Sequence, residues 1–126
     1  MSEYELLDLV AAAIDGMYDS TTMFLSLASG YLLVAYLAGA KLTSAQSSIV
    51  SALFIVGALL QCWGLLTYET AVEEYLIAKA DVAPLTSYQQ SVLEGNAGTL
   101  IASAMAVGTI AALYFMWSVR HPKSEG

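Results

Sequence analysis

The chain has 126 residues, of which 58% are hydrophobic and only 12% are charged. A soluble domain carries about 25% charged residues, so this composition favours a membrane protein. The net charge of −7 argues against nucleic acid as a partner and against an electrostatic hold on anionic lipid. A single cysteine, Cys62, excludes an internal disulfide, and a single histidine, His121, argues against zinc sites and histidine-based triads.

Residues 1–19 are predicted to form an amphipathic helix. Ser2 and Glu5 have the spacing of a capping box. At 100° per residue, the acidic side chains that follow fall on one side and the apolar ones fill the other. We expect this helix to lie flat on the outer face of a membrane, against lipid or against the other helices. A signal peptide is not expected, because no Lys or Arg precedes Lys41.

Three stretches of the chain lack charged residues and proline, and each is long enough to cross a bilayer. They hold 21, 27 and 25 residues, at 20–40, 42–68 and 95–119. About 20 apolar residues in a helix cover the hydrocarbon core. Buried helices of a soluble bundle would instead show a charged face. We therefore expect one all-α integral membrane domain over residues 1–126, with transmembrane helices at 20–40, 46–68 and 96–119.

The connections between these helices differ in length. The polar turn at 41–46 is short, so the first two transmembrane helices must be antiparallel neighbours. The second helix is expected to continue to about residue 80 and to stop before Pro84. Residues 84–94 are predicted to be an outer loop with a helix capped by Thr86 or Ser87. Residues 120–126 form the tail.

The basic residues predict which way the chain faces. Lys41, Arg120 and Lys123 fall on one side, and Lys79 alone falls on the other. Short loops rich in Lys and Arg stay cytoplasmic, so we expect an outer N-terminus and a cytoplasmic C-terminus. The expected location is the cytoplasmic membrane of a prokaryote. Ten of the eleven acidic residues, all except Glu125, then lie on the outer side.

Catalytic and metal-binding groups are scarce. The predicted transmembrane helices contain no Asp, Glu, Lys, Arg or His, which argues against proton-coupled transport. Glu69 and Glu73, four residues apart, are the only weak candidates for metal ligands. Two carboxylates cannot complete a calcium site, which takes six to eight oxygens, so we expect a solvated acidic surface there. We predict no catalytic residue, no metal and no cofactor; a bound lipid fits the apolar surface.

The sequence favours a role in helix packing. A carboxamide in hydrocarbon must face protein or water, so Gln61 is expected to bond to a neighbouring helix. The third transmembrane helix has two faces of small residues, which let helices approach closely. One face should hold the three helices together and the other should meet another subunit, unless these residues merely reflect average membrane composition. The first face holds Gly95, Gly98, Ala102, Ala106 and Thr109, and the second holds Ala97, Ala104, Gly108 and Ala111.

The sequence thus favours a small non-enzymatic membrane protein that acts by helix–helix association. It would work as a homo-oligomer or as an accessory subunit, with membrane lipid and a membrane protein as partners. One alternative is an oligomeric cation pore lined by Ser47, Ser51 and Gln61, with an acidic outer mouth. Another is an enzyme that acts on lipid at the outer interface through Tyr and Glu side chains.

Overall fold

All secondary structure in the computed structural model, which describes residues 2–123, is helical. Three of the helices are long and apolar enough to cross a membrane. The all-helical prediction with three such helices is therefore confirmed. The elements in chain order are α1 (Glu3–Ala38), the short 3-10 helix η1 (Gly39–Lys41), α2 (Ser44–Ala80), α3 (Ser87–Glu94) and α4 (Ala97–Arg120).

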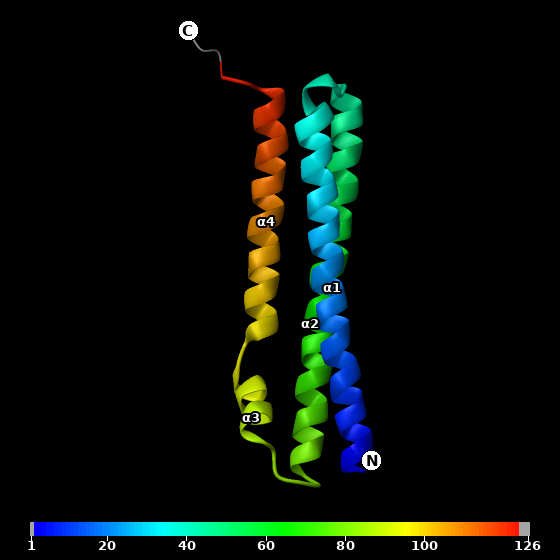
Figure 1. Ribbon diagram of the computed structural model, residues 1–126, viewed down its shortest axis with the longest axis vertical. Coiled ribbons are helices and arrows are strands. Elements are labelled where there is room, and N and C mark those ends of the chain that lie inside the picture. The colour runs from blue at the N-terminus through cyan, green and yellow to red at the C-terminus, as the bar shows by residue number, and fades with distance from the viewer. Residues whose placement is uncertain (1, 124–126) are drawn as a thin grey trace.

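The helices α1 and α2 form a long antiparallel hairpin, and α4 runs beside it in the same direction as α1 (Figure 1). The turn between α1 and α2 is closed by a capping box. Thr43 Oγ1 accepts a hydrogen bond from Gln46 N at 3.1 Å, and Gln46 Oε1 accepts one from Thr43 N at 3.0 Å. We call this part of the bundle, residues 38–51 and 113–123, the turn end.

The N-terminal segment corrects one expectation from the sequence. Residues 1–19 were expected to form a separate helix lying flat on a membrane, but α1 continues unbroken from Glu3 to Ala38 along the bundle axis. The reason is its packing on α2. Leu6, Val10 and Ala13 are buried, and the ring of Tyr68 lies so close to Gly16 that a Cβ there would come within 2.6 Å of Tyr68 Cζ.

The far end of the hairpin has a small core of its own. Val10 and Ala13 of α1 pack with Val72 and Leu76 of α2, and side chains of α3 and its connection cover them. Thr86 caps α3, with its Oγ1 accepting a hydrogen bond from Gln89 N at 3.1 Å. We call this part, residues 3–17 and 69–94, the stalk.

Lys79 ties the stalk together. Its side chain is buried, with a relative exposure of 2%. The ammonium group donates hydrogen bonds to Pro84 O at 3.1 Å and to Gln89 Oε1 at 2.7 Å, and it lies 3.7 Å from Glu3 Oε1. One cation therefore joins the start of α1, the end of α2 and the start of α3.

Between the stalk and the turn end, the buried residues form a narrow seam along the helix axis. Phe24, Ala58, Leu65 and Met105 make one cluster. A second cluster, next to the turn end, holds Tyr31, Ala35, Phe54, Ala112 and Met116. Large apolar side chains outside this seam face away from the bundle, among them Leu25, Leu33, Leu59, Leu100 and Ile110.

Candidate functional site

An apolar groove of about 560 Å³ runs between α1 and α4. Thr21 carries the one hydroxyl among the residues that line it, and that hydroxyl donates to Met17 O at 2.9 Å. The groove therefore offers no free side-chain hydrogen-bond donor to an occupant and suits an apolar one. Its lining includes Phe24, Leu25, Ala28 and Leu32 of α1 and Ala104, Gly108 and Ala111 of α4.

The two small-residue faces of α4 point to different surroundings. Gly98 is buried, Ala102 is half-buried, and the carbonyl oxygen of Ala102 lies 4.0 Å from the thiol of Cys62 on α2. The first face thus turns toward α2, although Ala106 on it is exposed. On the second face Ala104 is exposed and Gly108 is half-buried, and both line the groove beside α1.

Gly98 of α4 packs closely against the side chain of Glu69 on α2. A Cβ added there would overlap the carboxyl group of Glu69 and lie 2.9 Å from Glu69 Cβ. Gly98 belongs to the first turn of α4, where unpaired N–H groups and the helix dipole favour a negative charge. Glu69 therefore acts as a contact between two helices, which explains why one of the two candidate metal ligands is half-buried.

The other candidate ligand, Glu73, is also half-buried and lies one turn farther along α2. Within residues 2–123, no three side chains of His, Cys, Asp or Glu gather closely enough to hold a metal ion. Cys62 lies next to another sulfur, with its Sγ 3.6 Å from Met105 Sδ.

The serine face of α2 ends against an aromatic pair. Ser51 Oγ lies 2.8 Å from the hydroxyl oxygen of Tyr31, and the Tyr31 ring stacks on Phe54 with centroids 4.3 Å apart and planes inclined by 11°. Ser47 lies one turn nearer to the turn end and is half-buried. The hydroxyl groups of this face of α2 therefore gather at the turn end.

Gln61 lies on α2 between the buried residues Ala58 and Leu65 and is itself half-buried. The expected hydrogen bond from its side chain to a neighbouring helix is not found within the described part of the chain, residues 2–123. A carboxamide in apolar surroundings is costly without a partner. Gln61 is therefore the polar side chain in the middle of the bundle that a second chain could still bond.

Sequence reasoning missed two cationic contacts. Lys79 was counted as a loop charge, although it is the centre of the stalk, and Arg120 was treated as a tail residue. The guanidinium of Arg120 donates through Nη1 to Gly39 O at 3.0 Å and to Leu42 O. The sequence could have predicted the contact of Arg120. The first and third long helices end on the same side of the bundle, so a basic residue at the end of one can donate to the last carbonyl groups of the other.

Comparison of the chain with protein-family models, with curated proteins and with solved structures found no match.

Proposed function

We propose that this chain is an integral membrane protein in which α1, α2 and α4 cross the bilayer. Each of these helices contains an apolar window of 18 residues, and at most 22% of any window is buried within the chain itself. Exposed apolar patches on soluble proteins rarely exceed a few hundred Å². A surface with so many exposed Leu, Ile and Val side chains is suited to the hydrocarbon core of a membrane.

The proposed orientation places the stalk outside and the turn end in the cytoplasm of a prokaryotic cell. Lys41, Arg120 and Lys123 belong to the turn end, and Lys79 of the stalk is buried against its partners. The positive-inside rule then favours a cytoplasmic turn end. α1 and α2 have 36 and 37 residues. Helices of that length reach roughly 55 Å, well beyond a hydrocarbon core of about 30 Å, so the stalk extends into water.

The function we propose is self-association through the groove between α1 and α4. The observation that carries it is the open second face of α4, where Ala104, Gly108 and Ala111 line the groove. In lipid, small residues let two helix backbones pack closely. The van der Waals contact between the backbones then stabilises the association, because the hydrophobic effect does not act between helices in lipid. Ala97, Ala104 and Ala111 recur every seven residues, so the same face of a second copy can meet it in a symmetric pair.

We favour this function over the alternative of a cation pore. A pore would need the polar side chains Ser47, Ser51 and Gln61 to line one continuous water path. The hydroxyl of Ser51 is bonded to Tyr31, and the stacked Phe54 ring separates it from Gln61 within the chain. The groove that remains open, between α1 and α4, is apolar.

The mass of the detergent-solubilised particle tests the proposal. We expect wild-type protein to purify as an oligomer of identical chains. Ala104→Leu and Gly108→Leu should shift the particle toward the monomer, because the larger side chains fill the groove. Ala106→Leu is the matched control, since Ala106 is an exposed alanine on the side of α4 away from the groove.

Three outcomes count against self-association. A monomeric wild-type particle would overturn it, and so would equal effects of Ala104→Leu and Ala106→Leu on the particle mass. A particle that contains one copy of this chain with a different membrane protein would replace it with the accessory-subunit role.

A further inference from the structure

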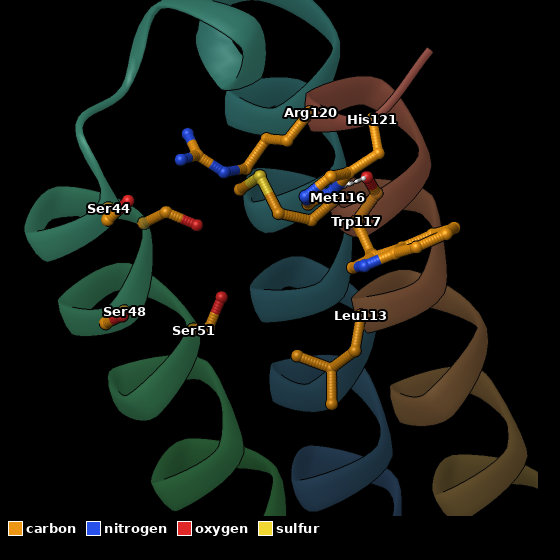
Figure 2. Close-up of a pocket in the computed structure, with 9 residues that line it drawn as sticks. Ser44, Ser48, Ser51, Leu113, Met116, Trp117, Arg120 and His121 are labelled. Atoms are coloured by element: carbon orange, nitrogen blue, oxygen red, sulfur yellow. Dashed lines mark hydrogen bonds between the residues drawn. The ribbon is translucent and has the colours of Figure 1, made fainter. Parts of the chain in front are cut away.

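The turn end contains a second pocket, of about 320 Å³, between the start of α2 and the end of α4 (Figure 2). Unlike the groove, it is lined by polar side chains as well as by the apolar side chains of Leu113 and Met116. Ser44, Ser47, Ser48 and Ser51 line it from α2, and Trp117, Arg120 and His121 line it from α4. Figure 2 shows the Arg120 side chain reaching from the end of α4 toward the first turn of α2.

The charge of Arg120 is not neutralised by a carboxylate within residues 2–123, where the ion pair found is Lys79 with Glu3, in the stalk. Its Nη1 group donates to the carbonyl oxygens of Gly39 and Leu42, which holds the guanidinium in place. A guanidinium has five N–H donors, so Nη2 and Nε keep donors for an occupant of the pocket. Arg120 is thus a positioned cation that still has hydrogen-bond donors for a ligand.

The opposite wall of the pocket adds neutral donors. Ser44 is the first residue of α2, and the backbone N–H groups of a first helical turn have no partner within the helix. The capping box satisfies Gln46 N through Thr43 Oγ1, so the backbone donors that remain in this first turn are the N–H groups of Ser44 and Ala45. A helix N-terminus beside serine hydroxyls favours an anion through its dipole.

His121 and Trp117 form the edge of the pocket. The two rings stack with centroids 4.9 Å apart, and His121 Nδ1 lies 2.9 Å from Trp117 O, which fixes the orientation of the imidazole. The acidic residues described in the structure belong to α1 up to Asp19, to the stalk and its connection, so they do not repel an anion here. Within residues 2–123, the acidic side chains therefore lie away from this pocket.

We propose that this pocket binds a phosphate group. Arginine, serine hydroxyls and a helix N-terminus are the donors that phosphate oxygens take most readily. The inference rests on the proposed membrane location, because the pocket then lies at the cytoplasmic interface, at the depth of lipid headgroups. The phosphate can come from an anionic phospholipid or from inorganic phosphate in the cytoplasm, and the experiment separates these two sources.

Fluorescence of Trp117 reports occupancy of the pocket directly. In a Trp63→Phe variant, Trp117 is the only tryptophan in the chain. The protein is reconstituted in liposomes that contain brominated phosphatidylglycerol or, at the same mole fraction, brominated phosphatidylcholine. We expect the anionic lipid to quench Trp117 with about fivefold higher apparent affinity, because its headgroup carries no cation to be repelled by Arg120.

Variants of the pocket provide the controls. Ser47→Val combined with Ser48→Val fills the pocket and leaves Arg120 and its carbonyl partners unchanged, and it should abolish the preference for the anionic lipid. Arg120→Gln should do the same by removing the charge. Ser26→Val combined with Ser29→Val makes the same two changes on α1, away from this pocket, and should keep the preference.

Inorganic phosphate, added to the liposomes at increasing concentration, distinguishes the source. Loss of the lipid preference would show that the pocket takes free phosphate as well, and an unchanged preference would show a site for lipid phosphate. Equal quenching by both lipids in protein that resists alkaline carbonate extraction would overturn the phosphate site alone. Complete carbonate extraction, with no quenching by either lipid, would overturn the membrane location too.

Discussion

The stalk and the rest of the bundle are built from the same two helices but differ in the side chains that cover their outer surface. In the stalk, Val72 and Leu76 face inward, and most acidic side chains are exposed or half-buried. Toward the turn end, the parts of the two helices at 20–38 and 44–68 carry no acidic side chain. Apolar side chains such as Leu33 and Leu59 cover the outer surface there, and the hydrogen bond between Tyr31 and Ser51 lies inside. A continuous helix that loses its acidic side chains and keeps apolar ones on its outer surface is what we expect where a chain passes from water into hydrocarbon.

The third element that packs on the hairpin also differs between the two regions. In the stalk it is α3, which has eight residues and none that is fully buried, so polar contacts of Lys79 hold it. Farther along it is α4, which buries Gly98, Met105, Ala112 and Met116 against the hairpin. The packing of α3 therefore combines the polar contacts of Lys79 with apolar contacts of Val92 and Leu93, whereas the packing of α4 depends on buried apolar side chains.

The largest loss of stability is expected from the addition of a single methyl group at Gly98, where these two regions meet. Gly98→Ala places a Cβ against the carboxyl group and Cβ of Glu69, and we expect it to lower stability by about 2 kcal/mol through overpacking. Gly30→Ala is the matched control. A Cβ at Gly30 meets nothing within 4 Å, so this change should raise stability by about 0.5 kcal/mol. Thermal unfolding in detergent, followed by circular dichroism, measures both, and equal shifts would contradict the contact with Glu69.

A comparable loss, confined to the stalk, is expected from Lys79→Met. It leaves Pro84 O and Gln89 Oε1 without their charged donor and should destabilise the packing of α3 by about 2 kcal/mol. Proteolysis of the connection between α2 and α3 should become faster, while amide exchange in α4 stays unchanged. Lys41→Met, at an exposed lysine of the turn end, should change neither measurement. Faster exchange along all of α4 would mean that the two regions do not unfold separately.

The smallest effect should come from Gln61→Leu. Because the carboxamide has no partner within the described chain, its removal should change the stability of the monomer by about 1 kcal/mol or less. Ser51→Ala, which breaks the bond to Tyr31, should instead lower stability by about 0.6 kcal/mol. A loss of several kcal/mol for Gln61→Leu in monomeric protein would reveal a strong bond of Gln61 inside the chain.

Hydropathy and length were sufficient to predict an all-helical chain with three long apolar helices, because 42–68 and 95–119 contain no charge or proline. They failed at residues 1–19. There the acidic face suggested a helix lying on a membrane surface. The apolar side of such a helix can be covered by lipid or by another helix, and the two cases give the same sequence periodicity. The continuous α1 depends on the close fit of Gly16 to Tyr68, a contact between residues 52 positions apart in sequence.

The candidate site was predictable only in part. The repeat of small residues placed Gly98 and Ala104 on different faces of one helix, and the structure puts them toward α2 and toward the groove. The pocket at the turn end was not predictable in the same way. It joins serines of α2 to Arg120, and that pairing depends on how the last turn of α4 lies beside the start of α2.

The central claim, that one part of α2 lies in water and another in hydrocarbon, can be tested on this single helix. Ile77 and Leu59 are similarly exposed, at 57% and 64%. In a Cys62→Ala background, Ile77→Cys and Leu59→Cys are reconstituted separately in liposomes and treated with a water-soluble maleimide, which needs a hydrated thiolate. We predict rapid labelling of the cysteine at position 77, very slow labelling at position 59, and equal labelling of both after denaturation. Equal rates at the two positions in the folded protein would contradict the account.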